Sequence, residues 1–410
     1  MTSKERMLAA WNGKPADHVP LTTWSFGLKP PKKLAWENNG RPIKYWYSKR
    51  LEHIHTLPQT WDLEDDFKRV LAWQSLGVDD IIDVSVPWSI SPETTWNDSL
   101  IPANSSEKYP AMVREYQTPA GSVRQAVRKT GENPGTGWVV QPDYVPLIED
   151  YNIPRAAEHA VAKPSDVAAV KYLFRPPDEN ARKWFAERMR KVGDFAAKNG
   201  VAVQAWSAFG MDGVVWLAGT QGAVMLAMDE PEAFGRLLDL ITETDLARTQ
   251  LAAADPGVDM VVERGWYSST DFWSPGLFEK FLYPRIAAVA EVAHKHGKKF
   301  GYVMTTGVEK LGPKLAEAGV DVLYFVDPVQ DRFNLERAEE ILPSSMTLVG
   351  GTNALSLASG NLQRIKEEVK RALDLLGPTN RFILHPVDAL FPDTPWEGEE
   401  TMIAAWKEYR

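Results

Sequence analysis

Short apolar runs alternate along the chain with longer stretches in which apolar residues recur at helical spacing. Continuous apolar runs are typical of strands buried on both faces, and strand–helix repetition indicates a parallel sheet. Eight such runs are present, at 19–24, 81–86, 201–207, 258–263, 299–304, 320–326, 346–350 and 381–385. The last of them are separated by stretches with helical spacing at 274–296, 308–318, 335–342 and 362–376.

Eight strand–helix units predict an α/β protein that closes into a (β/α)8 TIM barrel. Gly297 and Gly319 each end a helical stretch directly before an apolar run, which supports this order. In such barrels the active site opens at the C-terminal ends of the strands. An open doubly wound sheet is the alternative, but no Gly-x-Gly-x-x-Gly follows a predicted strand, which disfavours its dinucleotide-binding form.

The segment at about 87–178 interrupts this rhythm. Two alternating runs flank Pro119-Ala120-Gly121 and predict a β-hairpin, followed by a long loop. No independent core is visible there. We therefore expect one domain over residues 1–410, with an insertion that covers the opening of the barrel.

Composition limits the classes of function. The 410 residues are 44% hydrophobic and include no cysteine, so disulfides, iron–sulfur clusters and thiolate zinc sites are excluded. A net charge of -9 argues against nucleic acid as a partner. No apolar stretch is long enough for a membrane span, and the N-terminus begins with a Thr2-x-x-Glu5 capping box rather than a signal peptide. We expect a soluble, cytoplasmic protein that acts on a small molecule.

Residues just past the predicted strands are the candidate functional groups. His385 lies three positions before Asp388, and this pair can exchange protons near neutral pH; the alternative is a structural histidine. Glu263 ends an apolar run, so burial would make it a general acid unless it pairs with Arg264. The expected catalytic residues are Glu263, His385 and Asp388. The expected substrate-binding residues are Trp24, Trp88, Trp206, Asp212, Trp216, Arg264, Tyr267, Thr305, Asp327 and Asn353.

Several of these residues have a plain structural interpretation as well. The 16 tryptophans can be ordinary core residues or can line an aromatic pocket. Asp327 precedes a proline and can serve a turn, and Asn353 follows two glycines where anions often bind, although no cation lies beside it. The pairs His53/His55 and His294/His296 diverge around a helix, so we expect them to be solvated, like the basic run at 29–33.

Six segments resemble the uroporphyrinogen decarboxylase superfamily, and they occur in the order typical of it. They are "SKERMLAAWNGKPADHVPL", "WLAGTQGAVMLAMDEPEAFGRLLDLITE", "SPGLFEKFLYPRIAAVAEVAHKHGKKFGYVMTTG", "LAEAGVDVLYFVDPVQDRFNLERAEEIL", "LVGGTNALSLASGNLQRIKEEVKRALDLLG" and "RFILHPVDALFPDTPWE". The resemblance implies the barrel and a deep pocket at the strand ends. It does not fix the reaction, because the superfamily includes porphyrin decarboxylases and corrinoid- or thiol-linked methyltransferases.

The chain departs from both branches at informative positions. Zinc-dependent methyltransferases of the superfamily carry His-x-Cys and a later Cys, which fall here on Val303, Thr305 and Asp388. No zinc is therefore expected, although an oxygen-and-nitrogen metal site from Glu263, His385 and Asp388 remains an alternative. The porphyrin decarboxylases have an arginine-rich segment and a catalytic aspartate, which fall here on the arginine-free "VPLTTWSFGLKPP" and on Val86. Their essential histidine falls on Asp388.

Three hypotheses follow. The first is demethylation of a small methoxylated or methylated substrate onto a corrinoid carried by a separate protein, because the chain has no Asp-x-His-x-x-Gly motif of its own. Glu263 or His385 would supply the proton, and the tryptophans would enclose an aromatic ether or a quaternary ammonium. The second is a lyase, most simply a decarboxylase, in which Arg264 holds a carboxylate. The third is a barrel that binds a small molecule without catalysis.

Overall fold

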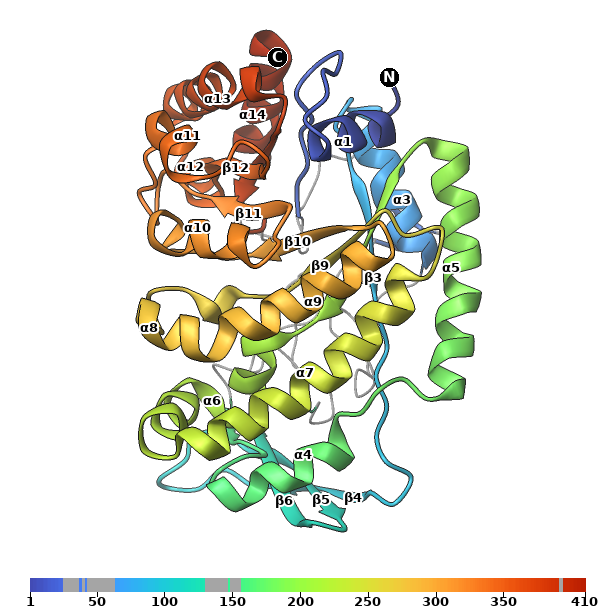
Figure 1. Cartoon of the computed structure of the whole chain (residues 1–410), viewed down its shortest axis with the longest axis vertical. Helices are drawn as coiled ribbons and strands as arrows, with labels where there is room; N and C mark the ends of the chain where they lie inside the picture. The colour runs from blue at the N-terminus through green and yellow to red at the C-terminus, as the bar shows by residue number, and fades with distance from the viewer. Residues whose placement is uncertain (25–36, 39–40, 43–62, 130–146, 148–155, 391–393) are drawn as a thin grey trace.

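The computed structural model describes residues 1–24, 37–38, 41–42, 63–129, 147, 156–390 and 394–410. Its centre is a curled parallel sheet of seven strands in the order β13-β12-β11-β10-β9-β8-β3 (Figure 1). The strands are β3 (Ile81–Ser85), β8 (Ala202–Ala208), β9 (Met260–Glu263), β10 (Lys299–Val303), β11 (Val322–Val326), β12 (Thr347–Asn353) and β13 (Phe382–Val387). The α/β class and a TIM-like architecture are confirmed.

The first predicted strand, at 19–24, is wrong as a strand. Leu21 forms a single parallel bridge with Leu384, flanked by backbone hydrogen bonds at 2.9 and 3.0 Å. On its other side the carbonyl of Leu21 accepts from the amide of Asp79 at 2.9 Å, just before β3. Pro20 and Pro386 have no amide hydrogen to donate, so the ladder cannot extend beyond this bridge in either direction. The segment thus lies between the two edge strands of the sheet and links them.

Helices cover the outer face of the sheet, and the four helical stretches predicted in the C-terminal half are confirmed. They correspond to α8 (Pro275–Leu277) with η5 (Phe278–Leu282) and α9 (Tyr283–Lys295), then α10 (Val308–Glu317), η6 (Leu335–Arg337) with α11 (Ala338–Ile341), and α13 (Leu362–Leu376). Further helices are α1 (Ser3–Trp11), α3 (Leu63–Ser75), α5 (Glu179–Asn199), α6 (Gly210–Asp229), α7 (Pro231–Ala253), α12 (Ala354–Ala358) and α14 (Trp396–Tyr409). The capping box of Thr2 and Glu5 is present at the start of α1.

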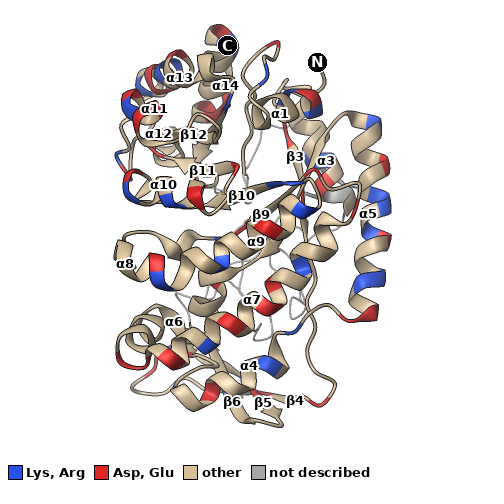
Figure 2. Cartoon of the chain, in the orientation of Figure 1, with Lys and Arg blue, Asp and Glu red and all other residues tan. Residues whose placement is uncertain are grey.

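Acidic and basic residues are interspersed along these helices (Figure 2). Within the described ranges, no helix has both the length and the apolar character that crossing a bilayer would demand.

The segment after β3 forms a separate antiparallel sheet in the order β4-β5-β6-β7. Its strands are β4 (Thr95–Ile101), β5 (Ala111–Thr118), β6 (Gly121–Arg128) and β7 (Ala156–Glu158). β5 and β6 pair up to Thr118 and Gly121, which encloses the turn at Pro119-Ala120. The sheet lies beside α4 (Val167–Leu173), at one end of the molecule in Figure 1. Its position over the barrel opening stays a prediction.

Side chains on the parallel strands alternate between two apolar layers. On β9, Met260 and Val262 belong to the inner layer, whereas Val261 packs in the outer layer against the helices. On β13, Ile383 is in the inner layer and Leu384 is in the outer layer. This period of two decides which residues near the strand ends face the inside of the barrel.

A buried ion pair on α7 joins three segments at the C-terminal end of the sheet. The guanidinium of Arg248 donates to the carbonyl of Val86 at 2.9 and 3.0 Å and to that of Trp206 at 3.3 Å. It also donates to Asp245 Oδ1 at 2.9 Å. Asp245 Oδ2 accepts from the amides of Phe209 and Gly210, both at 2.9 Å. Burial lowers the pKa of Arg248 to about 10, so it keeps its proton at neutral pH.

Replacement of Arg248 by Met should destabilise the fold by about 3–5 kcal/mol, because it leaves the Asp245 carboxylate buried without its cation. Urea unfolding followed by circular dichroism measures the change. The control is Arg371→Met, which breaks a half-exposed pair with Glu336 and should cost less than about 1 kcal/mol. Equal losses in the two variants would contradict the role assigned to Arg248.

Candidate functional site

Six aromatic side chains meet inside the barrel near the C-terminal ends of its strands. The ring of Trp24 is central: its centroid lies 5.0–5.9 Å from those of the other five. Trp266 also lies 5.9 Å from Trp206 and 5.9 Å from Phe325. We call this set the aromatic cluster; it consists of Trp24, Trp206, Trp266, Tyr324, Phe325 and His385. Sequence analysis placed Trp24, Trp206 and His385 in a site but missed the other three.

His385 is the polar member of the aromatic cluster and is fully buried. Its Nδ1 lies 3.0 Å from Oγ1 of Thr22, whereas its Nε2 has no hydrogen-bonding partner in the described part of the chain. Burial lowers the pKa of His385 to about 3, so the imidazole is neutral at physiological pH. A neutral imidazole can donate or accept a hydrogen bond but holds no charge to give away as an acid.

Trp266 and Asp388 form the partly exposed side of the aromatic cluster. The indole Nε1 of Trp266 donates to Asp388 Oδ1 at 3.3 Å. The carboxylate of Asp388 is thus directed to Trp266, and His385 makes its side-chain hydrogen bond with Thr22. The two residues are three positions apart, and the backbone of Asp388 hydrogen-bonds with the His385 imidazole, which raises the pKa of His385 against the larger effect of burial.

A polar network lies one layer deeper, on the inward-facing positions of three strands. The Trp206 indole donates to Asp83 Oδ1 at 2.9 Å, and the Gln204 amide donates to the same oxygen. Tyr324 donates its hydroxyl to Gln204 Oε1 at 2.8 Å. Burial raises the pKa of Asp83 to about 7. Sequence analysis missed Asp83, although a carboxylate within the apolar run at 81–86 was the available signal.

Glu263 does not belong to this site. It lines a small cavity in the outer layer together with residues of α7 and α9, and its Oε1 lies against Gly210, where a Cβ would come within 2.4 Å. Burial raises the pKa of Glu263 well above its usual value, and the charges of Asp245 and Asp212 add to this. Glu263 lies apart from His385 and Asp388, because it follows the inward-facing Val262 and therefore points outward, and its catalytic role stays a prediction.

The ion pair with Arg264, which was the alternative role considered for Glu263, is made by Asp212. Arg264 donates through Nε to Asp212 Oδ2 at 3.1 Å, and the amide of Tyr267 donates to Asp212 Oδ1 at 3.0 Å. The Arg264 guanidinium carbon lies 4.2 Å from the ring centroid of Trp266 and 5.0 Å from that of Trp216. Asp212, Arg264 and Tyr267 thus border the aromatic cluster.

The remaining predicted residues lie outside the aromatic cluster. Trp88 and Trp216 pack in the outer layer, at 5.2 Å from Phe174 and 5.1 Å from Phe209. Thr305 is half-buried after β10. His53, His55 and the basic run at 29–33 are outside the described residues.

Asp327 and Asn353 are occupied with local structure. The Asn353 amide donates to Asp327 Oδ2 at 2.8 Å, and Asp327 Oδ1 accepts from the amide of Val329 at 2.7 Å. Asn353 Oδ1 caps α12 by accepting from the amide of Leu355 at 2.8 Å. These contacts agree with the turn role considered for Asp327.

The donor set at the strand ends does not suit a thiolate zinc site. Val303 is a buried hydrocarbon side chain in the inner layer, and the chain has no cysteine. Across the ranges that the structure covers, no three His, Asp or Glu side chains are grouped to hold a metal ion. The oxygen-and-nitrogen site considered for Glu263, His385 and Asp388 is not formed, since Glu263 faces the helices.

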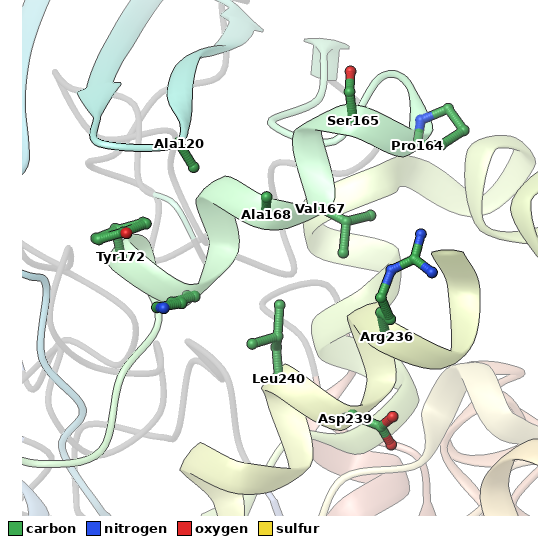
Figure 3. A pocket seen from close by; sticks show the side chains of 10 residues that line it. Ala120, Pro164, Ser165, Val167, Ala168, Tyr172, Arg236, Asp239 and Leu240 are labelled. Carbon is green, nitrogen blue, oxygen red and sulfur yellow. The ribbon is translucent and has the colours of Figure 1, made fainter. Parts of the chain in front are cut away.

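A cavity of about 540 Å³ lies elsewhere, between the turn at Ala120, α4 and α7 (Figure 3). Its lining includes the cations Lys171 and Arg236 and the apolar side chains of Ala168 and Leu240. None of its lining residues belongs to a strand of the parallel sheet, so it is separate from the aromatic cluster.

Comparison with known proteins adds to this geometry. The model of the family described as uroporphyrinogen decarboxylase (URO-D) matches residues 148–409. The methylcobamide:CoM methyltransferase MtaA of Methanosarcina barkeri is 26% identical over 211 residues, which cover 49% of this chain and 57% of the relative. The MtaA protein of Methanosarcina barkeri strain Fusaro has the same identity and the same coverage. The chain thus spans little more than half the length of these curated relatives. A solved methyltransferase from Methanosarcina mazei shares the fold, with a TM-score of 0.61 at 17% identity over 100% of this chain and 99% of that one.

The imidazole of His385 should remain neutral from pH 8 down to pH 5 in nitrogen-15 NMR spectra of the labelled chain. An unfolded histidine takes up its proton near pH 6.5. Since the pKa of His385 in the fold is about 3, its neutral form stabilises the fold above pH 6.5, and this contribution is lost as the pH falls toward 3. Assignment uses a His385→Gln variant; a titration of this resonance near pH 6.5 would rule out its burial.

The Asp83→Asn variant should remove a pH dependence of stability. In the folded chain Asp83 holds its proton up to about pH 7, whereas an unfolded aspartate loses it near pH 4. The wild-type free energy of unfolding should therefore fall, relative to the variant, by about 2 kcal/mol as the pH rises from 5 to 8. Urea unfolding at the two pH values measures this, and parallel curves would show that Asp83 is ionised in the fold.

Proposed function

The chain belongs to the uroporphyrinogen decarboxylase (URO-D) family, and from that premise we propose that it transfers a methyl group from a small methylated substrate to a corrinoid on a separate protein. The similarity to MtaA supports the methyl transfer and the corrinoid. Because the match covers little more than half of that relative, the substrate and the partner are part of the proposal.

The observation that carries the proposal is the aromatic cluster at the strand ends. Its rings provide an apolar surface on which a methyl group and a planar substrate can pack. Trp266 and Asp388 border it on the partly exposed side. We place the substrate against this side of the aromatic cluster, where the strand ends of such barrels hold their ligands.

The unpaired nitrogen of His385 favours a methoxylated substrate over a quaternary ammonium. A buried polar atom without a partner costs about 1–3 kcal/mol, and a ligand that supplies the partner recovers this. An ether oxygen can accept a hydrogen bond from Nε2–H, whereas a quaternary ammonium has neither a lone pair nor an N–H group. Thr22 favours this tautomer when its hydroxyl donates to Nδ1.

His385 acts in this scheme as a hydrogen-bond donor. When bound on its carrier, the corrinoid supplies the centre that accepts the methyl group. As the methyl group departs, the electron pair of the carbon–oxygen bond stays on the oxygen, and the Nε2–H of His385 stabilises the developing negative charge. Glu263 has no part in this step, because its carboxyl group lies in the outer layer.

The lyase hypothesis is supported by the description of the matching family but not by the placement of the residues. It assigned a substrate carboxylate to Arg264, whose guanidinium is buried, paired with Asp212 and stacked on Trp266. A barrel that only binds a small molecule would use the same aromatic cluster. The two hypotheses differ in whether the bound molecule is converted, so a measurement of turnover separates them.

Methyl transfer can be tested with the purified chain, chemically reduced cobalamin as acceptor, and a panel of methoxylated aromatics and methylated amines. We expect methylcobalamin, followed by its absorbance, to form from a methoxylated substrate. Loss of one hydrogen bond to the developing oxyanion lowers rates by about 10²–10³-fold, so His385→Ala should reduce kcat/KM to this extent.

The control variant is His294→Ala, which removes a surface histidine paired with Asp321 at 2.8 Å and should leave turnover unchanged. Failure of the wild-type chain with every methoxylated and methylated compound would refute the methyl transfer. Activity on quaternary ammonium compounds alone would refute the role given to His385.

A further inference from the structure

A buried ion pair borders the aromatic cluster without belonging to it. Asp212 lies in the first turn of α6, and Arg264 directly follows β9; both side chains are almost completely buried. The carboxylate of Asp212 accepts from Arg264 Nε at 3.1 Å and from the amide of Tyr267 at 3.0 Å. One carboxylate thus fixes both ends of the segment that carries Trp266.

The guanidinium of Arg264 in turn supports the indole of Trp266. Its central carbon lies 4.2 Å from the Trp266 ring centroid and 5.0 Å from that of Trp216. A planar cation stacked on an indole is attracted by the electron-rich face of the ring. Trp216 on α6 therefore lies on one side of the guanidinium, and Trp266 of the aromatic cluster lies on another.

Contacts with Tyr302 and Ser268 also fix the backbone around Trp266. A Cβ on Gly265 would come within 2.5 Å of the Tyr302 ring and of the carbonyl of Val303, so only glycine fits this close approach. Tyr302 donates its hydroxyl to Ser268 at 2.7 Å, and Ser268 donates to the carbonyl of Gly265 at 2.6 Å. The backbone is thereby fixed, but the indole of Trp266 is half-buried and depends on its ring contacts.

We propose that Asp212 and Arg264 are positioning residues that hold Trp266 as the substrate-facing wall of the aromatic cluster. The two residues do not touch the substrate; they set the orientation in which the indole contacts it and donates to Asp388. This inference rests on the proposed function for its kinetic consequence, but the position of the indole can be measured without turnover.

Two variants separate this role from the stability of the fold. Arg264→Lys keeps the charge but loses the planar surface that stacks on the indole. The double variant Asp212→Asn with Arg264→Gln removes both charges together, so no lone charge stays buried. Thermal unfolding confirms that each variant is folded before it is compared.

The chain offers a matched control in the antiparallel sheet. Arg114 is also buried, pairs with Asp98 at 2.6 Å and lies 5.3 Å from the ring centroid of Trp96. Arg114→Lys therefore makes the same chemical change in the same kind of contact, on a sheet that is separate from the aromatic cluster.

The first measurement is fluorine-19 NMR of the chain labelled with 5-fluorotryptophan, with the Trp266 resonance assigned through Trp266→Phe. We expect Arg264→Lys and the double variant to shift and broaden this resonance, and Arg114→Lys to leave it unchanged. An unchanged Trp266 resonance in both Arg264 variants would overturn the proposal, whether or not the chain transfers methyl groups.

The second measurement is steady-state kinetics with the methoxylated substrate. Because the indole contributes to binding, Arg264→Lys should raise KM by about tenfold and keep kcat within about twofold. A fall in kcat at constant KM would overturn the proposal, since it would place Arg264 in the chemical step. Absence of turnover in the wild-type chain would refute the proposed function and leave the NMR result to decide this inference.

Discussion

The contact between Arg248 and the ends of β3 and β8 determines how the open end of the barrel is arranged. The guanidinium donates to the carbonyl of Val86, just after β3, and to that of Trp206 in β8, which also accepts from the amide of Val86. Through Asp245 the same pair fixes the amides at which α6 begins. The first turn of α6 presents Asp212, and from there the contacts pass through Arg264 to Trp266. The wall of the proposed site thus depends on an ion pair that the substrate never meets.

Burial separates the titratable groups of this region into two kinds. Inside the barrel, the loss of water holds His385 neutral and lets Asp83 keep its proton up to about pH 7. Arg248 and Arg264 are equally buried, but each has a carboxylate at hydrogen-bonding distance. The buried arginines near the aromatic cluster are therefore compensated in pairs, and the imidazole inside the cluster is uncharged. Such an interior suits a neutral substrate and hydrogen bonding rather than proton transfer.

The fold was largely predictable because each strand and each helix has a recognisable pattern of apolar residues within a short stretch of the sequence. Each apolar run in the C-terminal half follows a helical stretch that ends at a residue such as Gly297 or Gly319, and the structure places strands and helices there. The first run failed as a strand because Pro20 interrupts its hydrogen bonding, a fact visible in the sequence but outweighed by its apolar character.

The site was predictable only in part, because it depends on which face each side chain occupies. Position at a strand end was enough to find His385 and Trp206, but it also selected Glu263, which the alternation along β9 turns toward the helices. Tyr324, Phe325 and Asp83 lie within strands, where apolar or isolated polar residues give no sign of a site. Trp266 is joined to the site by contacts with β8, β11 and the segment at Trp24, which only the folded chain brings together.

The bridge between Leu21 and Leu384 has a consequence for the order in which the molecule assembles. The two residues are separated by most of the chain, and the backbone at Trp24 is tied to Leu390 by a further hydrogen bond. A ribosome releases Leu384, the partner of Leu21, only after the whole stretch between the two residues has been made. Trp24, the centre of the aromatic cluster, therefore reaches its position only after β13 has been made. Bringing together residues so far apart in the chain costs loop-closure entropy that early local contacts cannot offset. The contact between the two edge strands and the centre of the aromatic cluster therefore form together, because both depend on the segment at Leu21 and Trp24.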